Sequence, residues 1–168
     1  MAMLKIVIYG ILLYIFLVFF ASRFTVRHLG FAKSRLPERL PKAMEEKIKE
    51  LKKKSKNKKE FFLKSYDFLA KRYQGAKGKT YPCFHMLYYG VEKVWSQKGF
   101  QHCTQQNFML RVFLVKSGFF KDEEIRLRHT VYIINIHQYM QVFLDGKWVD
   151  IDLWANFLGI KIAEHAGL

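Results

Sequence analysis

An uninterrupted apolar run stands near the N-terminus of the chain. Residues 6–22 read IVIYGILLYIFLVFFAS, without a charge, and are flanked by Lys5 and Arg23. An α-helix rises about 1.5 Å per residue, so the run reaches roughly 26 Å and, with its flanks, can span a bilayer core of about 30 Å. We therefore expect a transmembrane anchor over residues 1–22. A cleaved signal peptide is the alternative, although the end of the run lacks a clean small-x-small cleavage site.

A short stretch interrupted by prolines follows the apolar run. Residues 23–41 contain Pro37 and Pro41, which predict a juxtamembrane linker. More basic residues flank the run on this side than on the N-terminal side. By the positive-inside rule, this asymmetry favours a single-pass membrane protein whose domain is cytoplasmic.

Residues 42–80 combine helical periodicity with many lysines. Met44, Ile48 and Leu51 recur at helical spacing, and the apolar positions continue through Leu69, so we expect a basic amphipathic helical segment. It either docks on the domain with its lysines in solvent or lies on anionic lipid headgroups. The lysines available for lipid contact are Lys47, Lys49, Lys52, Lys53, Lys54 and Lys56.

Charge and cysteine content narrow the function classes. The net charge is +15, but residues 1–82 carry 20 basic and 6 acidic residues, whereas residues 83–168 carry 9 and 8. The C-terminal half is near neutral, so we do not expect nucleic acid as a partner. Its two cysteines, Cys83 and Cys103, form no disulfide scaffold, and no Cys/His spacing suggests a zinc site, so we expect no metal or cofactor.

The C-terminal half predicts an α+β domain over residues 81–168. Residues 103–116 form a helical pattern that is apolar on most sides and stops at Gly118. Strand patterns follow at 125–136, 138–144 and 147–153, and Asp145-Gly146 is a strong hairpin signal between the last two.

Three residues of this half carry a possible chemistry. Cys103 begins the predicted helix, where the dipole and free N–H groups favour a thiolate. His137 opens one strand and Asp152 closes the returning strand, so the turn brings them together at the open end of the hairpin. A cysteine, a histidine and an aspartate supply a nucleophile, its base and the group that orients the base.

The stretch from Trp95 to Asp152 resembles the transglutaminase-like superfamily of papain-type thiol enzymes. The resemblance lies in the cysteine that opens a helix ending at a glycine fifteen residues later, and in the pattern HxxxxVxxDGxWVxxD from His137 to Asp152. The chain departs from the family at four positions: Gln101 replaces a frequent glycine, Asn107 a small residue, Gln138-Tyr139 an Ala-Trp pair, and Leu153 a proline or small polar residue.

The resemblance implies a papain-like core, with the nucleophile helix packed on an antiparallel sheet, and a thiol acyl-transfer mechanism. Cys103 would attack a carbonyl, His137 would move the proton, and Asp152 would hold the imidazole. We expect a cysteine hydrolase of peptide or amide bonds that acts on a protein or peptide. A cross-linking acyltransferase and a catalytically silent interaction module are the alternatives.

The oxyanion formed in such a reaction requires at least two hydrogen-bond donors. The backbone N–H of Cys103 is one candidate, and the second would be Gln97 or the indole of Trp95. We expect Trp148 to be a core aromatic beneath the site.

Overall fold

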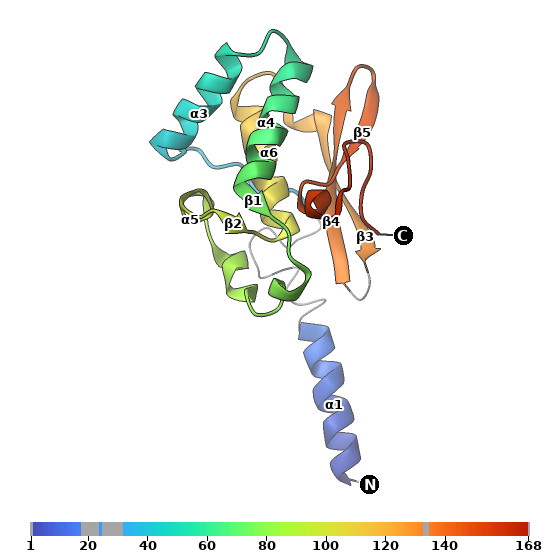
Figure 1. The fold of residues 1–168 in the computed structure, drawn as a ribbon. Coiled ribbons are helices and arrows are strands. Elements are labelled where there is room, and N and C mark those ends of the chain that lie inside the picture. Colours follow the sequence, from blue (N-terminus) through green and yellow to red (C-terminus); the bar gives the residue numbers. More distant parts are fainter. Residues whose placement is uncertain (1, 18–23, 25–31, 133–134, 168) are drawn as a thin grey trace.

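The described chain is a mixed α+β structure, which confirms the predicted fold class at that level (Figure 1). The computed structural model describes residues 2–17, 24, 32–132 and 135–167. Its longer elements are α1 (Ala2–Phe16), α3 (Lys42–Lys53), α4 (Lys58–Arg72), α5 (Val91–Ser96), α6 (Cys103–Lys116), β3 (Ile125–Tyr132), β4 (Asn135–Leu144) and β5 (Lys147–Ile151). The short strands β1 (Tyr73–Gln74) and β2 (Gly99–Phe100) pair in parallel, and 3-10 turns lie at Lys77–Lys79, Phe84–Tyr88, Asp122–Glu124 and Trp154–Leu158.

Helix α6 lies at the centre of the fold. It contacts α4 and strand β4, and eleven of its fourteen residues are buried. Met109, Val112 and Phe113 are fully enclosed, and burying side chains of this size stabilises the folded state by about 1.5–3 kcal/mol each. Gly118 follows the helix with φ +79°. The predicted helix and its glycine stop are therefore confirmed.

The predicted helical segment over residues 42–80 forms two helices, the second ending at Arg72, followed by the short strand β1 and a 3-10 turn. The break falls between α3 and α4, where the side chain of Asn57 caps α4 by accepting a hydrogen bond from the N–H of Glu60 at 2.9 Å. Met44 and Phe61 belong to the same core as α6. The segment is thus an integral layer of the domain, in agreement with the docked interpretation.

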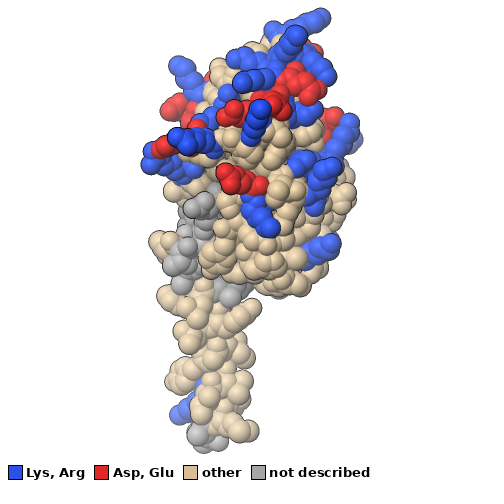
Figure 2. Space-filling model, turned by 90° about the vertical axis from the view of Figure 1, so that its left-hand side faces the viewer, with Lys and Arg blue, Asp and Glu red and all other residues tan. Residues whose placement is uncertain are grey.

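Several of the lysines singled out for lipid contact are engaged within the fold. Lys47 and Lys54 pair with Glu50, and the ammonium of Lys52 donates to the carbonyl of Ser117 at 2.7 Å. The remaining three, Lys49, Lys53 and Lys56, are exposed. Figure 2 shows acidic side chains interspersed among the lysines at this end of the molecule, so its surface carries mixed charge.

The part of the predicted linker that is described lies against the domain. The guanidinium of Arg111, almost fully buried, binds both carboxylate oxygens of Asp122 at 2.6 and 3.0 Å and donates to the carbonyl of Ser34 at 2.7 Å. Lys33 also donates to the backbone carbonyls of Asp122 and Ile125. These contacts fasten residues 33 and 34 to the start of the sheet.

Helix α1 carries apolar side chains that are exposed along its length; Leu4, for example, is 65% exposed. It covers 15 residues, and residues 18–22 of the expected anchor lie outside the described part of the chain. Among the described residues, no helix combines the length and apolarity needed to cross a membrane.

Strands β3, β4 and β5 form an antiparallel sheet in that order. Asp145 and Gly146 join β4 to β5 with φ +50° and +80°, which matches the mirror-image turn that suits a two-residue hairpin. The sequence predicted that His137 opens a strand. Strand β4 instead begins at Asn135, so His137 lies within it. Strand β5 ends at Ile151 rather than at 153, which leaves Asp152 just beyond the paired region.

Candidate functional site

Cys103 is the first residue of α6, and the preceding segment holds this end of the helix in place. His102 contacts the carbonyl of Cys83 through Nε2 at 2.9 Å, and Gln105 donates to the carbonyl of Met86 at 2.6 Å. The N–H of Gln105 donates to the carbonyl of His102 at 3.0 Å, whereas the N–H groups before it have no carbonyl four residues back within the helix. The thiol thus lies beside backbone donors that favour negative charge.

The β4–β5 hairpin brings His137 to Asp152. Nε2 of His137 lies 2.7 Å from Oδ2 of Asp152, and the two side chains are 3% and 1% exposed. The register that starts at Leu144 opposite Lys147 leads back to Met140 opposite Ile151. Asp152 is the next residue after this pairing, so the hairpin delivers both groups to its open end.

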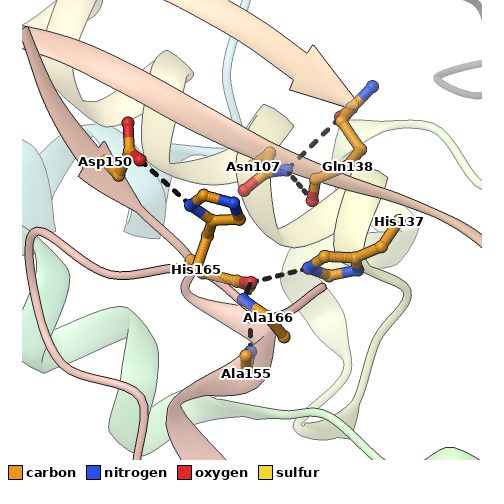
Figure 3. A network of polar contacts seen from close by, with 8 residues as sticks. Asn107, His137, Gln138, Asp150, Ala155, His165 and Ala166 are labelled. Atoms are coloured by element: carbon orange, nitrogen blue, oxygen red, sulfur yellow. Dashed lines mark hydrogen bonds and ion pairs between the residues drawn. The ribbon is translucent and has the colours of Figure 1, made fainter. Parts of the chain in front are cut away.

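The carboxylate of Asp152 is held on both oxygens. Oδ1 accepts a hydrogen bond from the N–H of Ala155 at 3.0 Å, and Oδ2 accepts one from the N–H of Ala166 at 2.9 Å in addition to that from His137. In Figure 3, Ala155 and Ala166 lie on the same side of His137, at the ends of these dashed contacts. A buried carboxylate with three hydrogen-bond donors is fixed in its orientation.

Cys103 and His137 form a hydrogen bond and shift each other's pKa. Burial alone raises the pKa of the Cys103 thiol, but hydrogen bonds from His137 and from the backbone N–H of Gln138 bring the pKa below its ordinary value. Burial alone lowers the pKa of His137, but hydrogen bonds to Asp152 and Cys103 raise it to about 10. Because Nε2 faces Asp152, Nδ1 is the ring nitrogen left for the sulfur. The arrangement favours a thiolate beside an imidazolium.

Trp154 packs beside the histidine of this group. Its ring centroid lies 5.2 Å from that of His137, and it forms a small apolar cluster with Ala155, Ala166 and Cys103. Trp148 does not lie beneath the site as expected. It contacts Phe143, and the guanidinium of Arg126 lies 3.8 Å above its ring.

The two residues proposed as oxyanion donors, Trp95 and Gln97, have different surroundings. Trp95 packs against Phe68 and Phe113, and Phe113 lies ten residues, or roughly 15 Å, along α6 from the cysteine. Its indole is therefore not brought to the thiol. Gln97 directly follows α5, and its Oε1 accepts a hydrogen bond from Nε2 of Gln101 at 3.3 Å. Gln101 lies two residues before Cys103, so Gln97 stays a candidate donor to the oxyanion.

Two of the departures from the family pattern contact each other. The side chain of Asn107 donates to the backbone carbonyl of Gln138 at 2.8 Å, and the backbone N–H of Gln138 hydrogen-bonds to Cys103. The backbone carbonyl and the backbone N–H of Gln138 are thus both hydrogen-bonded to residues of α6. The pair links the helix that carries Cys103 to the strand that carries His137, as Figure 3 shows for Asn107 and Gln138.

Asp150 and Asp152 have different hydrogen-bond partners. Asp150 accepts from Gln141 at 2.8 Å and lies 3.0 Å from Nδ1 of His165, rather than joining the group around Cys103. Both cysteines, Cys83 and Cys103, are free thiols.

The side chains around Cys103 suit proton transfer and nucleophilic attack rather than metal binding. Within the part of the chain that the structure describes, no group of three or more His, Cys, Asp or Glu residues could hold a metal ion. The resemblance to the transglutaminase-like superfamily depends on the motifs from Trp95 to Asp152. No family model matches the chain, and no curated protein or solved structure is significantly similar to it.

Proposed function

We propose that the chain is a thiol acyl-transfer enzyme that hydrolyses peptide or amide bonds. The observation that carries this proposal is the continuous contact from Cys103 through His137 to Asp152. A lowered thiol pKa and a raised imidazole pKa in one buried group are what a nucleophile–base pair requires. In this proposal the domain has a papain-like core, with α6 as the nucleophile helix on the β3–β4–β5 sheet.

The reaction would begin with attack of the Cys103 thiolate on the carbonyl carbon of the substrate. The backbone N–H of Cys103, at the start of α6, would donate to the developing oxyanion. The proton on Nδ1 of His137 would pass to the leaving amine as its bond to carbon breaks, which leaves an acyl-enzyme. His137 would then remove a proton from water, whose attack releases the acid and restores the thiolate.

The membrane anchor is part of the proposal. The apolar run over residues 6–22 and the exposed apolar side chains of α1 are the features that support insertion into a bilayer, because large contiguous apolar surfaces are rare on soluble monomers. The substrate would then be a protein or peptide that reaches the same membrane surface.

A two-part experiment on the full-length chain tests the chemistry. In a Cys83→Ser background, the rate of alkylation of Cys103 by iodoacetamide is followed against pH by intact mass. We expect reaction well below pH 8 and loss of this reactivity in His137→Ala. With p-nitrophenyl acetate, we expect one acetyl group on Cys103 and a stoichiometric burst of p-nitrophenolate. A thiol with an ordinary pKa of about 8.5, unaffected by His137→Ala, would refute the proposal.

A further inference from the structure

The C-terminal segment, residues 161–167, contacts the group around Cys103 directly. The N–H of Ala166 donates to Oδ2 of Asp152, the same oxygen that accepts from His137. Ala166 is 5% exposed and packs with Trp154 in the apolar cluster that includes Cys103. The segment is distant in sequence from α6, yet one of its backbone N–H groups donates a hydrogen bond directly to the carboxylate of Asp152.

Contacts on both sides of Ala166 hold it there. The His165 ring stacks on Tyr139 with centroids 4.1 Å apart and planes 2° from parallel, and its Nδ1 lies 3.0 Å from Oδ2 of Asp150. Earlier in the segment, the N–H of Ala163 donates to the carbonyl of Asp150 at 2.8 Å. In Figure 3 the His165 ring lies between Asp150 and the His137 side of the group.

Close packing continues after Ala166. Gly167 has φ +120°, and a Cβ at this position would lie 2.5 Å from Cγ2 of Thr130 and 2.8 Å from the carbonyl oxygen of Val131. Only a residue without a side chain fits this approach to β3. The segment is therefore seated on β4 and β5 before Ala166 and against β3 after it.

The arrangement leaves Asp152 dependent on this segment for its orientation. Ala155 holds Oδ1 of Asp152. Among the described residues, Oδ2 accepts hydrogen bonds from Ala166 and from His137, and His137 is the ring that the carboxylate is itself required to orient. A backbone N–H fixes the orientation of a carboxylate better than a side-chain donor does, because the chain on either side sets the position of the N–H. A third group in fixed position is what aligns a base with its nucleophile.

We propose that residues 161–167 are a positioning strap for the catalytic group, in which the Ala166 N–H orients Asp152 and His165 is the positioning residue that seats Ala166. This inference rests on the proposed Cys-His-Asp function, because the strap has a catalytic role only if that group reacts. Neither residue touches the reacting atoms. The strap affects the Cys103 thiolate indirectly, because it orients the Asp152 carboxylate, which in turn orients the His137 imidazole.

The test compares two substitutions of one residue in the full-length Cys83→Ser chain. Ala166→Pro removes the N–H, whereas Ala166→Gly keeps it and removes only a methyl group. The readout is the pH profile of Cys103 alkylation by iodoacetamide. We expect Ala166→Pro to move the midpoint of the profile upward by about one pH unit, so that the rate on its lower limb falls about tenfold, while Ala166→Gly follows the parent chain.

A second pair of variants keeps the test decisive if Ala166→Pro does not fold. His165→Ala removes both the stacking on Tyr139 and the contact with Asp150, and we expect an upward shift of the profile in the same direction. His165→Phe keeps the stacking and should recover part of the shift. Circular dichroism melting confirms folding for each variant.

The outcomes separate this inference from the function on which it rests. If the parent chain itself reacts as an ordinary thiol, the proposed function fails and the strap has no catalytic role. If the parent chain reacts at low pH and His165→Ala and any folded Ala166→Pro share its profile, the enzyme proposal stands and the strap proposal is overturned.

Discussion

Replacing Asp152 with asparagine removes one charge from the candidate site while keeping its shape. The best placement of the amide puts its oxygen at the Oδ2 position, where it still accepts from His137 and Ala166. The NH₂ group then faces the N–H of Ala155 across the present 3.0 Å contact. Two donors oppose each other there, so the variant loses one hydrogen bond and the negative charge that stabilises the imidazolium.

The size of the effect follows from the shifted titration of His137. A rise of its pKa from 6.5 to about 10 corresponds to roughly 5 kcal/mol of favourable interaction, shared between Asp152 and Cys103, because one pKa unit is about 1.4 kcal/mol. If the two partners contribute equally, about half of this interaction is lost with the Asp152 charge, and a buried donor without a partner costs about 1–3 kcal/mol more. We therefore expect Asp152→Asn to lower the free energy of unfolding by about 4–5 kcal/mol at pH 6.

The loss depends on pH with a definite sign. Because the folded-state pKa of His137 lies above the unfolded value of about 6.5, its stabilisation is complete below pH 6.5 and is lost as the pH rises through about 10. The difference between wild type and Asp152→Asn should therefore be largest at pH 6 and smaller at pH 10.5. Urea unfolding measures it: with a slope of about 1.5 kcal/mol/M, the midpoint at pH 6 falls by about 3 M.

Asp150→Asn is the matched control, since Asp150 lies two residues away on the same hairpin. Its amide can still accept from Gln141 and remain in contact with Nδ1 of His165, so we expect a change below about 0.5 kcal/mol. Equal stability of Asp152→Asn and wild type at pH 6, or an equal loss in both asparagine variants, would refute the assignment of charge to His137 and Asp152.

Three further changes test the packing around the site. Gly75→Ala would place a Cβ 2.4 Å from the carbonyl oxygen of Trp154; we expect a loss of about 1–3 kcal/mol in urea unfolding and slower alkylation of the thiol, and an unchanged midpoint would contradict this. Arg111→Met leaves the Asp122 carboxylate with one cation fewer. We expect the free energy of unfolding to fall by about 2 kcal/mol and proteolysis before residue 42 to become faster. Resistance to proteolysis equal to that of wild type would count against the docked linker. Met109→Ala empties a fully buried position of α6 and should cost about 2–5 kcal/mol by thermal unfolding, with a cost under 1 kcal/mol inconsistent with the packing described.

Local patterns predicted the elements whose signals lie within a few residues of each other. The helix from Cys103 to Lys116 follows from its apolar content and from Gly118, whose left-handed φ stops it. The hairpin at Asp145-Gly146 needs positive φ at both positions, which this pair accommodates. The turn sets the pairing register, and that register made the meeting of His137 with Asp152 predictable from spacing.

Boundaries without a strong local signal were missed. The break before α4 depends on Asn57 as a cap, but the lysines on both sides conceal it in a uniform helical pattern. The boundary between β3 and β4 falls within a stretch of β-branched residues, so the alternation gives no sign of where one strand ends. Trp95 fits the spacing of an oxyanion donor, yet the tertiary packing of α5 directs it to Phe113.

The partners of Asp152 could not be predicted for a different reason. Ala155 and Ala166 contribute backbone N–H groups, and every residue except proline has one, so the side-chain identity carries no sign of the role. The contact between Asn107 and Gln138 was equally hidden, because each residue by itself is an ordinary departure from a small residue. Such contacts become visible only when elements distant in sequence are placed side by side.

The contacts of residues 33 and 34 with the domain limit the distance that can separate Cys103 from an anchor in the membrane. An anchor that ends at residue 22 leaves ten chain steps before Ala32, because Lys33 and Ser34 are already bound to the domain. Ten chain steps reach at most about 36 Å. For a protein anchored as proposed, Cys103 samples a thin layer above the membrane, in which tethering raises the local concentration of bilayer-bound substrates. Such an enzyme would favour targets in its own membrane over equally cleavable ones in bulk solution.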